Sequence, residues 1–272
     1  YSAAQFYLPV RFMDPFIEPH HLAYVTEYDP YALMVEKTRD PLNNEMTALN
    51  NYRVLAPWLV TDVNQNRSGV RFDLLGLVTC SAVMGKAGAH EGDALDTASS
   101  EPLPTDDPTT RVVYEHFNWM NLGTPNRAHS LSRERHGAAN PRWQEVYTYS
   151  DGSGREVMRK IQAEPGQAPG RQANGPLKRD GQGRPLFELV ANRWVGTGRT
   201  VYNNKGMAVK QYEPFFDSSP DYTVERELVE WGFSPVLTYD PLNRLVRVDQ
   251  PDGRFSVQRF DAWVQESWDE ND

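Results

Sequence analysis

The sequence predicts an all-β protein made of repeated antiparallel β-hairpins. Its 272 residues include 19 glycines and 20 prolines, which are too many chain-breaking residues for a helical protein. Aromatic residues make up 11% of the chain, and aromatic side chains favour strands. A third observation is a regular spacing of 11 residues between polar turn residues near the start of the chain. This spacing suits one strand followed by one tight turn.

The C-terminal stretch, residues 239–272, shows the unit that recurs. Two alternating runs, residues 245–248 and 255–260, flank the sequence Pro251-Asp252-Gly253. Proline fixes φ at the first corner of a turn, aspartate bonds its own backbone, and glycine accepts a positive φ. The stretch therefore predicts a β-hairpin. Three aromatic–Asp pairs punctuate it: Tyr239-Asp240, Phe260-Asp261 and Trp268-Asp269.

The same kind of unit recurs near the N-terminus. Aspartates stand at positions 29, 40, 62 and 73, and Asn51 fills the missing position. Periodicity at this scale is typical of a repeat architecture. We expect each aspartate to accept hydrogen bonds from backbone N–H groups one or two residues further on, and each preceding ring to be buried between hairpins. The expectation covers Asp40, Asp62, Asp240 and Asp261, with the rings of Tyr28, Phe72, Tyr239 and Phe260.

The strands follow in order along the chain, each ended by Asp, Asn, Gly or Pro. Alternation predicts a first series at residues 6–12, 24–28, 33–38, 53–60, 69–72 and 77–83. A second series is predicted at residues 111–118, 128–135, 144–149, 155–163, 186–195, 200–202, 208–213 and 223–229. The short charged run 224–230 is alternatively a helix.

Two long loops interrupt these series. Residues 86–110 are rich in Gly, Ala, Asp, Ser and Pro and predict a surface insertion with one helical turn near residues 91–95. Residues 164–185 hold five glycines and four prolines, which argues against regular structure. We expect both loops to be exposed and to be the first sites of proteolytic cleavage. No linker divides the chain, so residues 1–272 are predicted to form a single segment with insertions near 85–110 and 164–185. Any boundary would lie near 85–110.

Charge and hydropathy exclude several classes of partner. The net charge of −9 argues against nucleic acid, because phosphate contacts need clustered Lys and Arg. No apolar run approaches the ~20 residues that a membrane helix needs, and no signal peptide is visible. The one cysteine, Cys80, lies in an apolar run and is expected to be a buried core residue rather than a reactive thiol.

Several residue groups resemble metal or catalytic sites, but each fits a structural role better. His20 and His21, beside Glu18, point to opposite faces if extended and cannot easily share one metal ion. His90, Glu91 and Asp93 lack the spacing of a calcium loop and are expected to be a solvated loop. The pair Glu266 and Asp269 is expected to belong to a turn rather than to a glycosidase site.

Two further motifs are incomplete. Gly85-Lys86-Ala87-Gly88 lacks the full phosphate-loop pattern, and Gly152-Ser153-Gly154 is a hairpin turn rather than a nucleophile elbow. We therefore predict no catalytic residue, cofactor or metal. Six tryptophans are expected to fill the seams between hairpins rather than to stack sugars: Trp119, Trp143, Trp194, Trp231, Trp263 and Trp268.

The aromatic–Asp unit, followed by Gly or Asn, Arg and alternating apolar residues, resembles the YD repeat of the RHS family. Longer sequence segments resemble the middle-to-C-terminal part of the B subunit of bacterial Tc (ABC-type) toxin complexes, over about residues 24–272. They are Tyr52-Arg53-Val54-Leu55, Tyr149-Ser150-Asp151-Gly152-Ser153-Gly154-Arg155, Arg193-Trp194-Val195-Gly196-Thr197-Gly198 and Trp268-Asp269-Glu270-Asn271-Asp272. Asn43, Asn64 and Asn243 stand where the repeat usually has glycine, and asparagine tolerates the same left-handed conformation.

This resemblance implies a segment of a curled β shell with a structural function. In the family, the B and C subunits form a hollow cocoon that encloses the toxic C-terminal part of the C subunit until it passes through the A-subunit channel. The implied partners are other segments of the same B subunit, the C subunit as shell partner and cargo, and the A-subunit channel. The implied location is secreted, with no membrane contact by this segment. The family's proteolytic and cytotoxic activities belong to the C subunit, so no enzyme activity is expected.

An alternative hypothesis is that the chain is a carbohydrate-binding or adhesive β module of a secreted bacterial surface protein. Exposed tryptophans and tyrosines in a row would favour sugar binding, whereas buried ones favour the shell. A β-rich hydrolase would need a pocket with converging carboxylates of perturbed pKa.

Overall fold

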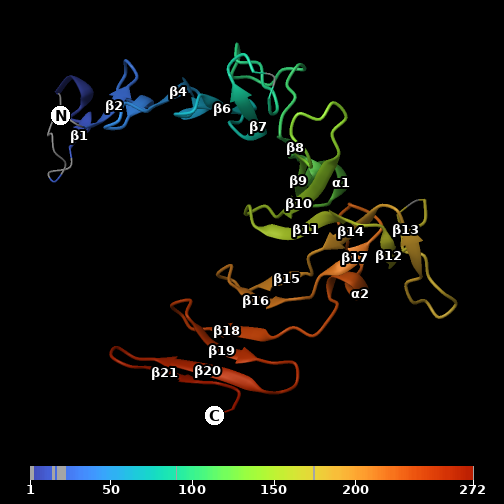
Figure 1. Ribbon diagram of the computed structural model, residues 1–272. Helices are drawn as coiled ribbons and strands as arrows, with labels where there is room; N and C mark the ends of the chain where they lie inside the picture. The colour runs from blue at the N-terminus through green and yellow to red at the C-terminus, as the bar shows by residue number, and fades with distance from the viewer. Residues whose placement is uncertain (1–2, 14–15, 17–22, 90, 174, 272) are drawn as a thin grey trace. The chain divides into compact units, whose positions relative to one another are not determined.

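The computed structural model describes residues 3–13, 16, 23–89, 91–173 and 175–271. These residues form two compact units, each described by itself. The first unit holds residues 1–113 and 130–144, and the second holds residues 114–129 and 145–272. Figure 1 labels the elements along the chain.

The first unit is a series of antiparallel strands paired in chain order. A short 3-10 helix (Ala3–Gln5) comes first, and β1 to β7 each pair with the next strand. The strands are β1 (Arg11–Phe12), β2 (Tyr24–Tyr28), β3 (Val35–Arg39), β4 (Glu45–Asn51), β5 (Ala56–Thr61), β6 (Asn66–Phe72) and β7 (Val78–Lys86). Thr110 and Arg111 of β8 (Thr110–Glu115) continue the ladder at β7. Consecutive pairing follows from tight turns, because a hairpin brings neighbouring strands together before any longer connection can.

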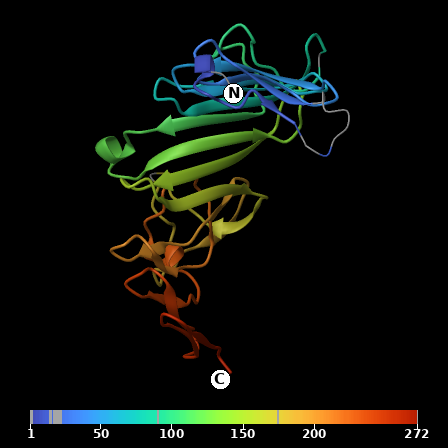
Figure 2. The ribbon, with the colours of Figure 1, turned by 90° about the vertical axis from the view of Figure 1, so that its left-hand side faces the viewer.

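The second unit contains three ladders of antiparallel strands. One pairs β10 (Trp143–Ser150) with β11 (Glu156–Ala163), then β14 (Arg193–Gly196) and β17 (Phe215–Asp217). A two-stranded sheet pairs β12 (Gly166–Pro169) with β13 (Phe187–Val190). The third ladder has six strands: β15 (Thr200–Tyr202), β16 (Ala208–Gln211), β18 (Val236–Tyr239), β19 (Leu245–Asp249), β20 (Phe255–Phe260) and β21 (Gln265–Trp268). Figure 2 shows β10 and β11 as neighbouring long strands.

The remaining elements are one strand and two short helices. Strand β9 (Asn126–Arg133), like β8 and β10, contributes residues to both units. Helix α1 (Asn118–Leu122) precedes β9 and ends at Gly123, whose φ of 68° gives a left-handed cap. Helix α2 (Arg226–Val229) follows β17. The predicted all-β fold of antiparallel hairpins is confirmed.

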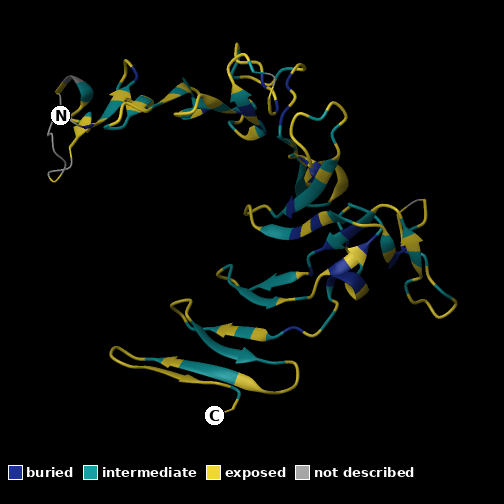
Figure 3. Ribbon diagram, viewed as in Figure 1, coloured by how far each residue is buried: buried dark blue, intermediate teal, exposed yellow. Residues whose placement is uncertain are grey.

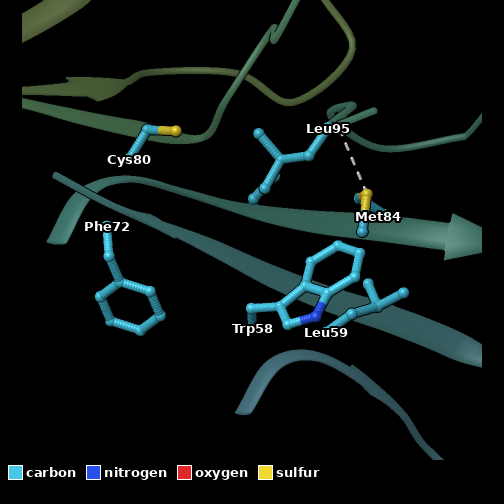
Figure 4. Close-up of a cluster of buried hydrophobic side chains, with 7 residues drawn as sticks. Trp58, Leu59, Phe72, Cys80, Met84 and Leu95 are labelled. Atoms are coloured by element: carbon cyan, nitrogen blue, oxygen red, sulfur yellow. Dashed lines mark hydrogen bonds between the residues drawn. The ribbon is translucent and has the colours of Figure 1, made fainter. Parts of the chain in front are cut away.

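Each unit has a small core of its own. The first unit buries Trp58, Leu59, Phe72, Cys80, Ala82, Met84 and Leu95, most of which Figure 4 labels. The second buries Tyr149, Met158, Leu177, Phe215, Leu228 and Val229. Most other strand residues are only half-buried or exposed, as Figure 3 shows. Buried residues therefore gather where an insertion or a helix lies against a ladder.

Both predicted loops contain more order than the sequence suggested. In residues 86–110, bridges join Met84 to Gly92 and Ala94 to Asp107, and no helical turn forms at residues 91–95. Leu95 is buried, with its N–H donating to the sulfur of Met84 at 3.3 Å. The interpretation as an exposed surface loop is wrong there, because Leu95 packs in the core and Asp93 and Asp106 are buried as well.

The second loop also contains regular structure. Strand β12 (Gly166–Pro169) lies inside residues 164–185, and bridges join Arg171 to Leu177 and Arg179 to Pro185. Proline is tolerated at the end of a short edge strand, where its missing N–H breaks no interior ladder.

Several predicted strands differ in position or type. Residues 3–5 form a 3-10 helix and the N-terminal strand shrinks to β1. Strand β4, which the sequence analysis missed, lacks an aromatic residue and ends in two asparagines. The alternative of a helix near residues 224–230 is confirmed by α2.

Candidate functional site

The repeated hairpin turn is the feature that recurs most often in this chain. In each copy the N–H of the first residue donates to the carbonyl of the residue four positions on, and the N–H of the fourth residue donates back to the first carbonyl. Copies begin at Asp40, Asp62, Asp73, Asp151, Gln172, Asp180, Asn203, Asp240 and Gln250. Asp29 begins a turn that is longer by one residue, since its N–H donates to the carbonyl of Met34.

The fourth residue of the turn has a left-handed backbone. Glycine holds this position in the turns at Asp73, Asp151 and Asp180, with φ between 76° and 83°. Asn43 and Asn243 take it with φ of 64° and 66°, as predicted for asparagine in place of glycine. The prediction for Asn64 is wrong, because Gln65 is the left-handed residue of that turn, at φ 69°.

The first side chain of the turn closes it from within. One carboxylate oxygen of Asp62 accepts the N–H groups of Asn64 and Asn66, both at 2.8 Å. Asp40 and Asp240 accept from residues two and four further on in the same way. Asp261 accepts from residues two and three further on. The predicted acceptors are thus confirmed, but the bonds reach further along the chain than one or two residues.

Arginine four residues after the aspartate adds a second contact. The pKa of Asp240 is lowered, first by the hydrogen bond from the backbone N–H of Arg244 and further by that arginine's side chain, whose Nε lies 2.7 Å from the carboxylate. The same guanidinium lies 4.5 Å from the ring centroid of Phe260 on the neighbouring β20. Arg155 likewise pairs with Asp151 and stacks 4.9 Å from the ring of Tyr202. Arg155 and Arg244 thus each hold their own turn and contact another hairpin.

A tyrosine just before the turn ties it to another strand segment. The hydroxyls of Tyr28, Tyr202 and Tyr239 donate to the carbonyls of Pro9, Glu156 and Ala208, at 3.2, 3.2 and 2.9 Å. These rings are half-buried, as is that of Phe260, and only Phe72 is buried. The predicted burial is therefore confirmed for Phe72 and wrong for Tyr28, Tyr239 and Phe260. A single-layered hairpin ladder leaves one side of each ring without a covering layer.

A buried carboxylate, Asp93, anchors the first insertion. Its oxygens accept Arg133 at 2.7 Å, the hydroxyl of Thr109 at 2.6 Å and the N–H of Gly137 at 2.9 Å, and they contact His136 at 2.7 Å. Burial alone would raise the pKa of Asp93, but these hydrogen bonds lower it to about 2. The expectation of a solvated loop at this position is therefore wrong.

A similar arrangement surrounds Asp217 in the second unit. Lys160 and Arg171 both bond its carboxylate, at 2.7 and 2.8 Å, and Thr223 donates its hydroxyl at 2.7 Å. Burial opposes the charge, yet these donors lower the pKa of Asp217 to about 2. Burial lowers the pKa of Lys160 to about 8, so both groups remain charged at neutral pH. Arg171 also bonds Glu225, which ties residues 171–177 to the start of α2.

Asp93 and Asp217 have the same kinds of partner. Each buried aspartate has an arginine, a threonine hydroxyl and one further basic side chain as partners. A carboxylate with a pKa of about 2 and all these donors is a poor general acid or base at neutral pH. The sequence analysis missed both anchors, because their basic partners lie 40 or more residues away in the chain.

The structure describes only part of the other residue groups that the sequence offers as metal sites. Glu18, His20, His21 and His90 lie outside the described residues, and Glu91 is exposed. The part of the chain that the structure describes holds no group of three His, Cys, Asp or Glu side chains placed to bind a metal ion. Cys80 is buried, and burial raises the pKa of its thiol to about 11, as expected for a core residue.

The tryptophans divide into two sets. Trp194 is buried and Trp143 half-buried, with the Trp194 ring edge-on to Tyr147 at 5.3 Å. Trp119, Trp231, Trp263 and Trp268 are exposed, so the prediction that they fill seams is wrong for these four within the units as described. No helix among the described residues is both long and apolar enough to span a bilayer.

Comparison with known proteins places this geometry among solved toxin-complex structures. No protein-family model matches the chain, and neither does any curated protein. The crystal structure of TcdB2-TccC3 superposes on 100% of this chain and 13% of its own, with a TM-score of 0.74 and 26% identity. The crystal structure of TcdB2-TccC3-Cdc42 covers 100% of this chain and 16% of its own, with a TM-score of 0.71 and 21% identity.

A third structure gives the same result. The Tc holotoxin pore of Photorhabdus luminescens covers 92% of this chain and 14% of its own, with a TM-score of 0.69 and 21% identity. The chain thus spans about an eighth of the first of these proteins. In fold, and over its whole length, this chain resembles a segment of the B–C part of bacterial Tc toxin complexes.

Proposed function

We propose that this chain is a structural, non-catalytic segment of a toxin-complex B subunit, and that it forms part of a hollow β-shell around a toxic polypeptide before translocation. The observation that carries the proposal is the repeated turn together with full-length superposition on the TcdB2-TccC3 structure. A wall needs hairpins that close by themselves and attach to their neighbours. An aspartate closes most of the turns, and in several of them a tyrosine or an arginine makes the attachment.

The buried ionic groups support a structural function. Asp93 and Asp217 have lowered pKa values and several fixed donors, whereas a general acid or base works best with a pKa near the working pH. A buried ion pair of this kind fixes one arrangement of the chain, since removing either partner leaves an uncompensated charge. Here the arrangement fixed is the seating of each insertion against its ladder.

The partners follow from the same proposal. Other segments of the same B subunit would extend the ladders, the C subunit would complete the shell and supply the cargo, and the A subunit would receive it. The similar structures carry B, C and pore components in their names. The complete assembly would be secreted, and the acidic net charge of this segment fits no nucleic-acid partner.

Protection of cargo from protease tests the function. The full-length polypeptide that contains this chain would be co-expressed with its C subunit, and the complex treated with a nonspecific protease. We expect the C-terminal region of the C subunit to survive in the complex and to be degraded in the isolated C subunit. Degradation at the same rate in both samples would contradict the proposal, as would hydrolytic turnover by this chain that a single acidic substitution abolishes.

A further inference from the structure

A small pocket of ≈ 240 Å³ opens in the second unit, beside helix α2. In Figure 1 this helix lies next to β17. The walls of the pocket come from strand β11, from the segment that leads into α2, from α2 itself and from the loop between β14 and β15. Every lining residue belongs to the second unit.

The walls of this pocket are mostly apolar. Met158 and Val229 belong to the core of the unit, with 2% and 5% of their surfaces exposed. Val157 packs against that core, and Val224, which is 69% exposed, lies at the rim. The inner wall is therefore the core itself, and an apolar group placed against it would be removed from water.

One charged side chain lies at the pocket. Among the described residues that line it, only Arg199 carries a charge. Its guanidinium bonds one oxygen of Glu230 at 2.9 Å, and the other oxygen of Glu230 accepts Arg226 at 2.9 Å. Two arginines thus share one carboxylate, which leaves one positive charge unbalanced. A guanidinium has five N–H donors, so Arg199 keeps donors for an anion.

The polar partners and the size of the pocket narrow the class of ligand. The hydroxyl of Thr223 donates to Asp217 at 2.7 Å and is therefore already used. Tyr222 is held by its ring, which lies 5.4 Å from that of Tyr149. The volume is below the range of about 300–1,000 Å³ that is typical of drug-sized ligands, so the ligand must be small. An apolar wall with one arginine matches a single negative charge on a short apolar body.

We propose that this pocket binds a small monocarboxylate with a short aliphatic or single-ring tail, its tail against Met158 and Val229 and its carboxylate on Arg199. A guanidinium pairs with a carboxylate through two parallel N–H···O bonds, which fix the orientation of the ligand as well as its charge. A nucleotide is too large for the pocket and carries more than the one negative charge that is needed. The proposal goes beyond the shell function, since a wall encloses cargo without a ligand on it.

Titration of the 272-residue chain with hexanoate and with phenylacetate tests the proposal, with the methyl NMR signals of the chain as the readout. We expect saturable shifts at the methyl groups of Met158, Val224 and Val229, and none at Leu189, which is exposed on β13. Affinity should rise about fourfold for each methylene added between butanoate and hexanoate, because each methylene leaves water on binding. Hexanol and hexylammonium have the same tail and should bind at least about tenfold more weakly than hexanoate, because neither carries a negative charge.

Two variants separate the charge from the apolar wall. Arg199→Met is expected to weaken hexanoate binding at least about tenfold and to leave hexanol binding unchanged. Val224→Phe narrows the rim and should weaken both. Arg184→Met and Leu189→Phe are the matched controls, because each alters an exposed residue of similar kind that does not line the pocket. Thermal unfolding shows whether each variant stays folded.

If Arg199→Met unfolds the chain, Arg199→Lys replaces it, since it keeps the charge without the planar fork and should bind hexanoate more weakly than the wild type. Absence of shifts at the pocket methyl groups with both acids would overturn the proposal. So would equal affinity for hexanoate, hexanol and hexylammonium, which would leave the pocket as an apolar gap. Unchanged hexanoate affinity in a folded Arg199→Met chain would overturn it as well. None of these outcomes bears on cargo protection, so the shell function is tested separately.

Discussion

At the scale of single residues, the fold depends on side chains that finish a turn and then reach another strand. Asp240 accepts two backbone N–H groups and the Arg244 side chain, while Tyr239 next to it donates to the carbonyl of Ala208. If the Tyr239 hydroxyl is removed, water can take its place as hydrogen-bond donor to the carbonyl of Ala208. The hairpin nevertheless loses one direct link to its neighbour. In the aromatic–Asp pair, the aspartate therefore closes the turn and the tyrosine bonds the turn to another strand.

Removal of one hydroxyl tests the attachment. We expect Tyr239→Phe to lower the free energy of unfolding by about 1 kcal/mol, because it deletes one hydrogen bond and keeps the ring. Tyr239→Ala should cost more, since it also removes half-buried ring surface. Thermal or urea unfolding measures both. Equal stability of the Phe variant and the wild type would show that the bond to Ala208 contributes nothing.

The buried carboxylates predict how stability depends on pH. Asp93 and Asp217 have folded pKa values of about 2, below the usual value of 3.8. Their contribution is fully present above pH ~4 and is lost as the pH falls toward ~2, at about 2 kcal/mol for each group. Denaturant unfolding between pH 2 and pH 6 measures this slope. Asp217→Asn should flatten it, and a slope unchanged in that variant would assign the acid sensitivity to other groups.

At the scale of elements, the sequence predicts what is local and misses what depends on distant partners. The hairpin at Pro251-Asp252-Gly253 could be predicted because turn chemistry acts over four residues. The anchoring of residues 86–110 could not, because Asp93 looks like any acidic loop residue until Arg133 lies beside it. The glycines and prolines of residues 164–185 argued against regular structure, yet β12 forms there, because a short edge strand tolerates both residue types.

The anchors change the expected pattern of proteolysis. In the wild-type chain we expect first cuts in the exposed parts of the insertions, near residues 97–102 and 181–184, and none next to Asp93 or Leu95. Arg133→Met leaves Asp93 buried without its arginine partner, at a cost of about 3–5 kcal/mol, so cleavage should spread to residues 91–96. Limited proteolysis with mass mapping reads out the positions.

A matched control accompanies this experiment. Glu91→Gln alters an exposed acid in the same segment and should leave the cleavage pattern unchanged. Early cleavage at residues 91–96 in the wild-type chain would contradict the anchoring by Asp93.

At the scale of the whole molecule, each unit is built of open β-ladders around one small core. Buried residues gather beside the two insertions, and many apolar side chains on the ladders stay exposed. Large exposed apolar surface is typical of a surface that meets further protein. The chain spans only 13% of the similar TcdB2-TccC3 chain. In the proposed shell, other segments of the B subunit would cover this exposed apolar surface.

A cryo-electron microscopy map of the full-length polypeptide in complex with its C subunit tests the central claim most directly. The account predicts that these residues lie within a continuous wall of hairpins, with the repeated turns intact and with density for the cargo on one side of that wall. A map in which residues 24–271 form a separate module, outside any enclosed volume, would contradict it.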